Sequence, residues 1–437
     1  MGRNMRTLFK NCDIITREGD LFTVIKRGFL AVDGDTISYV GKERPEGTFD
    51  AEKDMDRYIL VPGLINCHNH SPMTLLRGVG SDLPLQKWLF DTVFPIEERL
   101  TAQQVRVGSE LAVLEMLSTG TTSFSDMYQD SRETIEVAIE TGIKANIHVP
   151  VLAFDPDESY SDNVRVKNSL ALAREFGNAA DGRVKTQFCI HAEYTCNEKV
   201  VRAYSEDCLK YGSMIQVHLS ETKSEHDECV RKYGKTPAQW FESLGAFDSP
   251  ASAAHCVWVT PDDMDIFREK GVSVVHNPTS NMKLGSGFAP IPEMLEKGIN
   301  VTLGTDGTAS NNNLNMFEEM HLAALIHNGR RCDPTIMTPQ QVLKMATVNC
   351  AIQQGRPETG SLEAGKRADI IAVSLDRPHM YPAFDDINML TYSAQGSDVT
   401  MTMVDGRILY ENGEFKTIDA ERVMFDAKRA VDEIYSV

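Results

Sequence analysis

The chain has 437 residues, of which 42% are hydrophobic and 24% charged, with a formal net charge of −19. This composition is that of a folded globular protein with a sizeable core, and it excludes disordered and fibrous chains. The negative charge disfavours nucleic acid and anionic membrane surfaces as partners, so we expect a small neutral or cationic substrate.

Nine cysteines with scattered spacing predict free thiols and a cytoplasmic protein. No apolar run approaches the ~18 residues that a membrane span requires. The N-terminal residues alternate apolar with polar instead of forming the apolar centre of a signal peptide. We therefore expect neither a membrane segment nor a targeting segment.

Both ends of the chain are expected to be rich in β-structure. Strand-like alternation predicts strands at Leu8–Ile15, Gly28–Val32, Thr36–Val40, Asp369–Leu375, Met401–Val404 and Arg407–Tyr410. An amphipathic helix is predicted at Ala420–Tyr435. We predict that residues 1–58 and 368–437 form one small β-sandwich domain that includes this helix.

In the central region, apolar runs of strand length alternate with helical stretches, a pattern typical of parallel βα units. Helices are predicted at Thr101–Ser118, Ser131–Glu140 and Asn197–Tyr211. Eight runs are candidate strands, namely Ile59–Asn66, Thr122–Asp126, Lys144–Val149, Lys185–Ile190, Met214–Leu219, Ala253–His255, Val272–His276 and Val301–Thr305. The sequence thus predicts an α/β fold, a TIM-like (β/α)₈ barrel over residues 59–367 joined to the small β-sandwich domain.

Histidine and aspartate residues fall at the C-terminal ends of these predicted strands. His68 and His70 end the first strand, and a spacing of two directs both imidazoles to one side. The fifth to eighth strands end in His218, His255, His276 and Asp306. Any one of these residues alone is better explained as a buried, hydrogen-bonded side chain or a turn residue. Together they predict a shared site, because the C-terminal strand ends of a barrel meet in one cup.

The donor set of this site is chemically informative. Three imidazoles and a carboxylate suit zinc or iron(II), and they leave a coordination position open for water. Structural zinc in an intracellular protein more often uses clustered thiolates, whereas the cysteines here are dispersed. The pattern therefore favours a catalytic metal.

The chain resembles the amidohydrolase superfamily, and within it the 5′-methylthioadenosine/S-adenosylhomocysteine deaminases. The resemblance is carried by Val61–His70, His218–Glu221, His276–Leu284, Gly304–Gly307 and Gly360–Asp369. It implies one metal ion per subunit, zinc or else iron(II), bound by His68, His70, His218 and Asp306. Members with two metals carry a bridging lysine at the end of the fourth strand, where this chain has His191.

The resemblance also implies a hydrolytic deaminase. In such enzymes a metal-activated hydroxide attacks C6 of an adenine ring, and ammonia leaves. We expect Glu221 to bind the substrate and shuttle protons, His255 to orient the hydroxide, and Asp306 to accept a proton from the attacking water. The chain contains no P-C-x-x-C sequence, which excludes the zinc deaminases of the cytidine-deaminase type.

Further residues are expected to bind the nucleoside. By resemblance, Glu97 accepts hydrogen bonds from the ribose hydroxyls, and His191 bonds adenine N3. Leu85 and Trp88 could form an apolar wall, although helix packing explains them equally well. Glu193 stands where relatives carry proline, a departure in the wall of the pocket.

A second difference from the family pattern bears on the 5′ group of the substrate. Members that accept S-adenosylhomocysteine grip its carboxylate with arginines after the third strand, but residues 144–164 contain no arginine and the nearest is Arg165. We therefore predict that 5′-methylthioadenosine, 5′-deoxyadenosine or adenosine is preferred over S-adenosylhomocysteine.

Three alternative functions remain open. The first is a guanine or pterin deaminase, whose substrate has no ribose for Glu97 to bind, and the second is a triazine hydrolase, which does not always need Glu221. The third is a catalytically silent scaffold, which would be expected to have lost metal ligands. Barrels of this kind are often homo-oligomers, which we expect here by analogy.

Overall fold

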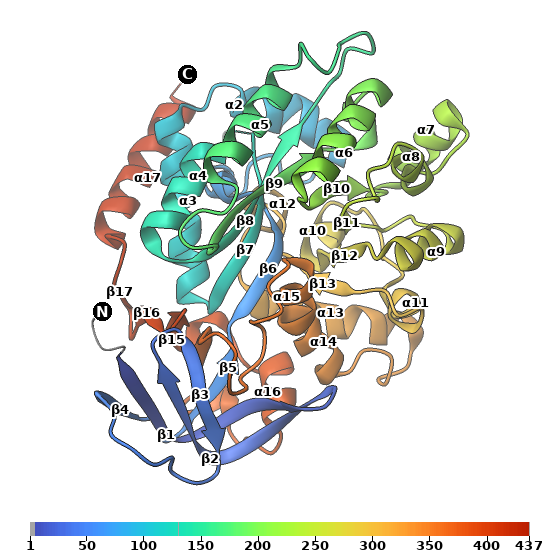
Figure 1. Cartoon of the computed structure of the whole chain (residues 1–437). Coiled ribbons are helices and arrows are strands. Elements are labelled where there is room, and N and C mark those ends of the chain that lie inside the picture. The colour runs from blue at the N-terminus through green and yellow to red at the C-terminus, as the bar shows by residue number, and fades with distance from the viewer. Residues whose placement is uncertain (1–4, 130, 437) are drawn as a thin grey trace.

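Eight parallel strands form the barrel at the centre of this computed structural model, which describes residues 5–129 and 131–436 (Figure 1). In chain order they are β6 (Leu64–Asn69), β7 (Thr121–Met127), β8 (Lys144–Val151), β9 (Val184–Ile190), β10 (Ile215–Leu219), β11 (Ala251–His255), β12 (Ser273–His276) and β13 (Val301–Leu303). The first and last strands are tied where the chain leaves β13, because Asp306 N donates to His68 O (2.9 Å) and Thr305 N donates to the Asn66 side chain (3.1 Å). The ends of β6 and β13 therefore lie side by side.

Helices cover the barrel (Figure 1). They are α3 (Ala102–Ser118), α4 (Ser131–Thr141), α5 (Val164–Phe176), α6 (Glu198–Tyr211), α7 (Lys223–Tyr233), α8 (Pro237–Ser243), α9 (Pro261–Lys270), α10 (Pro278–Lys283), α11 (Ile291–Glu296), α12 (Thr308–Asn311), α13 (Met316–Arg331), α14 (Pro339–Ala346) and α15 (Val348–Gln353). Several begin at a capping side chain, as Thr101 does for α3 and Asn197 for α6. The helix predictions at 101–118, 131–140 and 197–211 are confirmed.

Short helical segments lie between the main elements. They are η1 (Ser71–Leu76), α1 (Leu85–Trp88), η2 (Leu89–Val93), α2 (Phe94–Glu97), η3 (Glu193–Thr195), η4 (Pro378–Met380), α16 (Asp386–Tyr392) and η5 (Gly396–Asp398). The segments from η1 to α2 follow β6 directly, so they stand above the C-terminal end of the barrel. Within the described residues, no helix has the length and apolar character to cross a membrane.

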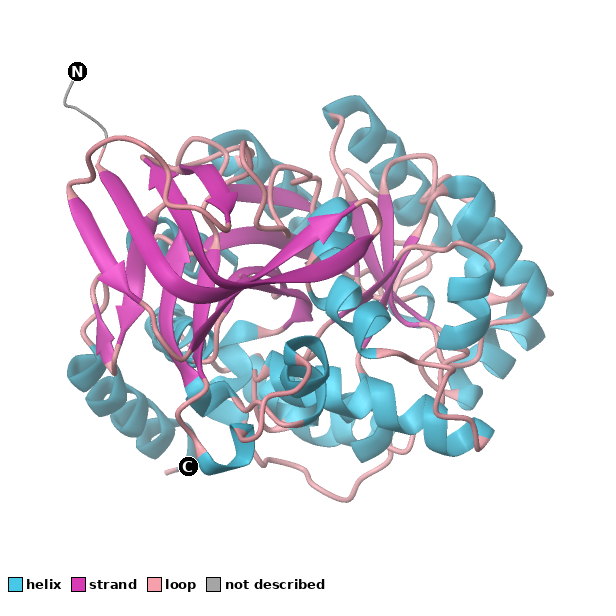
Figure 2. Cartoon of the chain, turned by 90° about the horizontal axis from the view of Figure 1, so that it is seen from below, coloured by secondary structure: helices cyan, strands magenta, loops and turns pink. Residues whose placement is uncertain are grey.

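A second sheet lies beside the barrel (Figure 2), and its strands come from the two ends of the chain. Its strands are β1 (Arg6–Glu18), β2 (Leu21–Asp33), β3 (Thr36–Gly41), β4 (Ala51–Asp54), β5 (Tyr58–Pro62), β14 (Ile370–Ser374), β15 (Val399–Val404), β16 (Arg407–Glu411) and β17 (Glu414–Phe415). The ends meet at β5, which pairs with β1 on one side and β14 on the other. Leu30, Leu60, Ile370 and Met401 pack in one core, so the two halves of the sheet enclose shared apolar side chains.

The predicted strand Ile59–Asn66 is wrong as a single element. The chain leaves the mixed sheet at Pro62 and enters the barrel at Leu64. Gly63 makes this change possible, because a Cβ there would stand 2.2 Å from Thr122 Oγ1. The predicted domain limits remain a prediction, and residues 1–4 and 437 of the outer domain lie outside the described residues.

The C-terminal helix α17 (Ala420–Tyr435) confirms the helix predicted there. It runs alongside the barrel helix α3 (Figure 1). Ala427 and Ala430 pack with Leu75 and Val107. The last helix of the chain therefore contacts the barrel.

A buried ion cluster joins the barrel to the mixed sheet. Lys144, with an exposed fraction of 3%, donates to both oxygens of Asp369 (2.6 and 2.7 Å) and to Asp405 (2.6 Å). Asp369 precedes β14 and Asp405 follows β15, whereas Lys144 begins β8. The cluster therefore couples the two parts electrostatically.

We expect Lys144→Met to lower the free energy of unfolding by about 3–5 kcal/mol, because it leaves the buried carboxylate of Asp369, and beside it the half-buried carboxylate of Asp405, without their cation. Urea unfolding followed by circular dichroism measures the change. Lys210→Met is the matched control, since its ion pair with Asp207 is exposed and worth less than about 1 kcal/mol. Equal losses in the two variants would contradict the prediction.

Candidate active site

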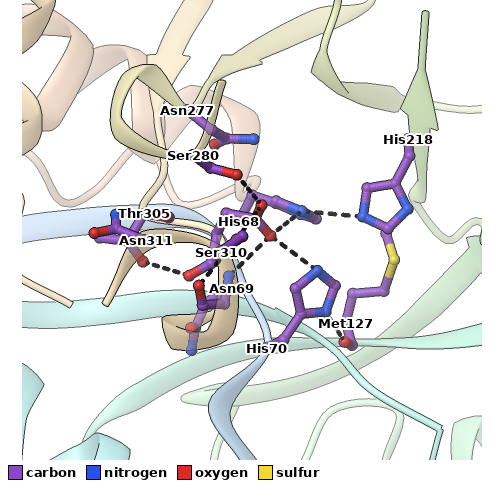
Figure 3. A network of polar contacts seen from close by, with 12 residues as sticks. His68, Asn69, His70, Met127, His218, Asn277, Ser280, Thr305, Ser310 and Asn311 are labelled. Carbon is purple, nitrogen blue, oxygen red and sulfur yellow. Dashed lines mark hydrogen bonds and ion pairs between the residues drawn. The ribbon is translucent and has the colours of Figure 1, made fainter. Parts of the chain in front are cut away.

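Four predicted ligand side chains converge at the C-terminal end of the barrel (Figure 3). The Nε2 atoms of His68 and His218 lie 3.2 Å apart. Oδ1 of Asp306 is 3.4 Å from His68 Nε2 and 3.1 Å from His70 Nε2. Residues from β6 and the position after it, from β10 and from the loop after β13 thus gather their donor atoms around His68.

The opposite ring nitrogen of each histidine is already hydrogen-bonded. His68 Nδ1 donates to Gln216 Oε1 (3.1 Å) and His218 Nδ1 donates to the backbone oxygen of His191 (2.9 Å). His70 Nδ1 donates to the backbone oxygen of Met127. With the proton on Nδ1, the Nε2 atoms of His68 and His218 present lone pairs to each other. A cation satisfies such facing lone pairs.

Three of the donor-atom spacings suit a tetrahedral ion. Ligands 2.0–2.1 Å from a zinc ion at tetrahedral angles stand about 3.3 Å from one another, close to the 3.1–3.4 Å between His68 and His218, His68 and Asp306, and His70 and Asp306. His68 belongs to two compact donor groups, one with His70 and Asp306 and one with His218 and His255. Burial lowers the pKa of His68 to about 4, so its ring is neutral and able to bind a metal. Burial also opposes a charge on His70, but Asp306 outweighs it and raises the pKa of His70 to about 9. The site therefore favours a positive charge and fits a divalent metal ion.

Asp306 is held by its backbone and by three hydrogen bonds. Its φ of +61° is left-handed, a region that aspartate tolerates better than most residues. Oδ2 accepts from Ser280 (2.6 Å) and Ser310 (2.8 Å), and Oδ1 accepts from Gly307 N (2.8 Å). Burial alone would raise its pKa, but the bonds from His68 and His70 hold the pKa of Asp306 well below its usual range. The carboxylate is therefore charged and fixed in orientation.

Glu221 and His255 stand beside this cluster. Glu221 Oε2 is 3.7 Å from His255 Nε2, and Oε1 accepts from Ser286 Oγ (3.3 Å). His255 has φ +73°, and its Nδ1 bonds Asn281 Oδ1 (2.9 Å). Burial, followed by the negative charge of Asp306, raises the pKa of Glu221 to about 8. Glu221 can therefore hold or release a proton near neutral pH.

A cavity of about 690 Å³, counting its open mouth, lies above these residues. Its polar lining includes His70, Glu97, Gln129, His191, His218, Glu221, His255 and Asp306, and its apolar lining includes Met73, Leu85, Trp88, Leu89, Phe94 and Leu152. Polar groups at the floor and sides combined with apolar walls suit a flat, partly polar ligand.

The two residues predicted for ribose and adenine both face this cavity. Glu97 is buried on α2, and His191 follows β9 with its ring 4.8 Å from that of His218. Burial, together with the charges of His70 and Arg165, lowers the pKa of His191 to about 3. His191 is therefore neutral and can donate or accept a single hydrogen bond.

One of the strand-end residues does not join the site. His276 turns toward α13, where its Nε2 lies 3.3 Å from Nε2 of His327. It does not line the cavity, unlike His218 and His255. Its place in the group of convergent residues was therefore wrong.

The residues that position the ligands were not predicted. Ser280 and Asn281 lie within the His276–Leu284 motif, and they bond Asp306 and His255. Gln216, which bonds His68, lies two residues before His218 on β10 and so points to the same face. The polar side chain of Gln216 in an otherwise apolar, buried strand could have indicated this role.

Arg165 lies closer to the cavity than its place in the sequence suggested. It is the second residue of α5 (164–176), and its guanidinium donates to Oε1 of Gln129, a residue of the cavity lining. An arginine therefore contacts the lining of the cavity although residues 144–164 contain none.

Residues 59–409 match the Amidohydrolase family. A 5-methylthioadenosine/S-adenosylhomocysteine deaminase of Acetivibrio thermocellus is 43% identical over 434 residues, covering 98% of this chain and all of the relative. A 5′-deoxyadenosine deaminase of Methanosarcina mazei is 41% identical, covering 98% of each. The crystal structure of an adenosine deaminase from Xanthomonas campestris with bound zinc superposes with a TM-score of 0.93 at 29% identity over all of both chains. The fold and the resemblance carried by the motifs are confirmed, and the chain belongs to the amidohydrolase family.

Proposed function

We propose that this protein is a metal-dependent hydrolytic deaminase that converts an adenine nucleoside to the corresponding inosine analogue and ammonia. The observation that carries the proposal is Glu221, a buried carboxyl group with a raised pKa at the floor of the cavity, beside the converging imidazoles. Exchange of an aromatic amine for oxygen requires such a group, because the ring nitrogen must gain a proton as the ring is attacked.

We propose zinc as the metal, one ion per subunit, with iron(II) as the alternative. His68, His70, His218 and Asp306 would hold it. Such an ion lowers the pKa of bound water toward ~7 and thereby supplies hydroxide at neutral pH. The names of the deaminase relatives and the zinc in the Xanthomonas campestris structure support this assignment.

The chain's own residues supply the proton transfers. Glu221 would give its proton to the ring nitrogen next to C6 and regain one from the hydroxyl group on the attacked carbon. Asp306, ionised at the start, can accept the other proton of the attacking water, and the departing amine receives that proton as the C–N bond breaks. His255, oriented by Asn281, hydrogen-bonds the attacking oxygen and fixes its direction.

Three residues would select the nucleoside. Glu97 can accept both ribose hydroxyls, His191 can bond adenine N3, and Trp88 contributes an apolar wall. A guanine or pterin deaminase acts on a base without ribose and does not need a residue such as Glu97, and a triazine hydrolase does not always need a general acid such as Glu221. Glu97 and Glu221 therefore favour the nucleoside over the rival heterocycles.

Loss of adenine absorbance tests the substrate class directly. We expect turnover of 5′-methylthioadenosine, 5′-deoxyadenosine and adenosine, with lower kcat/KM for S-adenosylhomocysteine and none for guanine or atrazine. Glu97→Gln should raise KM for the nucleosides by about 10-fold, the effect of losing one charge-assisted hydrogen bond of about 1.4 kcal/mol. Equal or better turnover of S-adenosylhomocysteine would contradict the 5′ preference, and Arg165→Gln then tests whether Arg165 binds its carboxylate.

We also propose a cytoplasmic location and a homo-oligomer. All nine cysteines are free thiols, and eight are buried, which suits a reducing compartment. Light scattering of the purified protein measures the oligomeric state.

A further inference from the structure

Two buried glutamates lie behind the active site. Glu193 begins η3, just after β9, and Glu225 lies in the first turn of α7, just after β10. Their exposed fractions are 2% and 4%. The segment η3 packs against α7, and the two carboxyl groups lie close enough to interact. Two elements that follow neighbouring barrel strands thus meet through a pair of acids.

One oxygen of Glu225 is committed to the backbone of the active-site loop. Oε2 accepts from the N–H groups of Glu221 (2.9 Å) and Thr222 (3.2 Å). This bond fixes the backbone that carries the Glu221 side chain. The position of Glu225 therefore bears on the position of Glu221.

One oxygen of each carboxyl group lacks a donor within the described part of the chain. Among the described residues, no N–H or O–H donates to Oε1 of Glu225 or to Oε2 of Glu193. Two adjacent carboxylates in such a buried place repel each other and lack solvation. A single proton between the two groups relieves the repulsion and supplies the missing donor, as in other carboxyl pairs that share one proton.

The groups around the pair do not supply the compensating charge. Lys232 on α7 is exposed, and Glu221 adds a further carboxyl group. Burial raises the pKa of Tyr194 and of Cys229, so both are neutral. Burial lowers the pKa of His255, which faces Glu225. On α8, which packs against η3, Glu242 pairs with Lys270.

We propose that Glu193 and Glu225 share one proton and thereby clamp the segment carrying His191 to the loop carrying Glu221, which holds the general acid/base in place over the substrate ring. Glu193 lies two residues after His191, and Glu225 bonds Glu221 N. The shared proton itself does not depend on the reaction. Only the catalytic role of the clamp rests on the proposed function.

The shared proton has a definite effect on stability. The glutamate that holds it has a higher pKa in the folded protein than the ~4.3 of an unfolded chain. The folded state therefore binds more protons, and stability falls as pH rises from about 4 through the folded pKa. In Glu193→Gln the amide donates to Glu225 at every pH, so this loss disappears.

The test compares thermal unfolding of the metal-loaded wild type and Glu193→Gln between pH 6 and pH 9. We expect the midpoint of the wild type to fall by roughly 2–4 °C relative to Glu193→Gln over this range. Glu206→Gln, the same change at an exposed position on α6, should follow the wild type. Parallel curves for the wild type and Glu193→Gln would overturn the proposal.

Kinetics with 5′-methylthioadenosine test the clamp. We expect Glu193→Ala to lower kcat by about 10-fold with KM changed much less, and Glu193→Gln to restore kcat at neutral pH. An unchanged kcat in Glu193→Ala would overturn the positioning role. If the wild type deaminates no adenine nucleoside while the unfolding curves separate as expected, the proposed function fails but the shared proton stands.

Discussion

Glu221→Gln is expected to lower kcat by about 10³-fold, in the middle of the range for a lost general acid/base. Glutamine keeps the size of the side chain and its contact with Ser286, but it can neither give nor take a proton. The loss should therefore fall on kcat, while KM changes little. Initial rates with 5′-methylthioadenosine measure both.

Two further measurements separate this loss from a structural one. Metal content should be that of the wild type, because Glu221 is not among the four converging ligands. Unfolding should also be little changed, since the bond from Glu221 N to Glu225 belongs to the backbone. A variant that retains more than about a tenth of the wild-type kcat would exclude Glu221 as the proton shuttle.

Strands covered by helices were the easiest part of the fold to predict. The strand predicted at 122–126 became β7 (121–127), and the strand predicted at 144–149 became β8 (144–151). Both are fully buried, although their sequences, TTSFSDM and KANIHVPV, mix polar with apolar residues. The break at Gly63 lies within the apolar run Ile59–Asn66, where the close approach of Thr122 leaves no room for a Cβ. The edge strand β4 (51–54) was not predicted, since its sequence, AEKD, carries almost no apolar side chain.

The candidate site was predictable where chemistry and strand-end position coincide. His68, His70, His218 and Asp306 follow from the rule that C-terminal strand ends meet in one cup. His276 satisfies the same rule, yet its ring faces His327, because the rotation of a strand end decides which side chain enters the cup. Arg165 differs in the other direction. It lies outside the stretch after the third strand in which an arginine was sought, yet its side chain bonds a residue of the cavity lining.

Asp306→Asn is expected to abolish most metal binding and with it the activity. The amide keeps the shape and can still accept from Ser280 and Ser310, but it brings no charge to balance the ion. We expect a loss of at least about 10³-fold in kcat/KM, the equivalent of the several kcal/mol that a catalytic metal contributes.

Chelation and reloading give this prediction its control. Dialysis against a chelator should inactivate the wild type, and zinc should restore it but not Asp306→Asn. Ser310→Ala leaves all four ligands in place and removes one hydrogen bond to the carboxylate, so metal affinity should fall by only about 10–100-fold and excess zinc should restore the rate. If Asp306→Asn retained wild-type zinc and failed only in turnover, Asp306 would act on protons rather than as a ligand, and the ion would rest on His68, His70 and His218 alone.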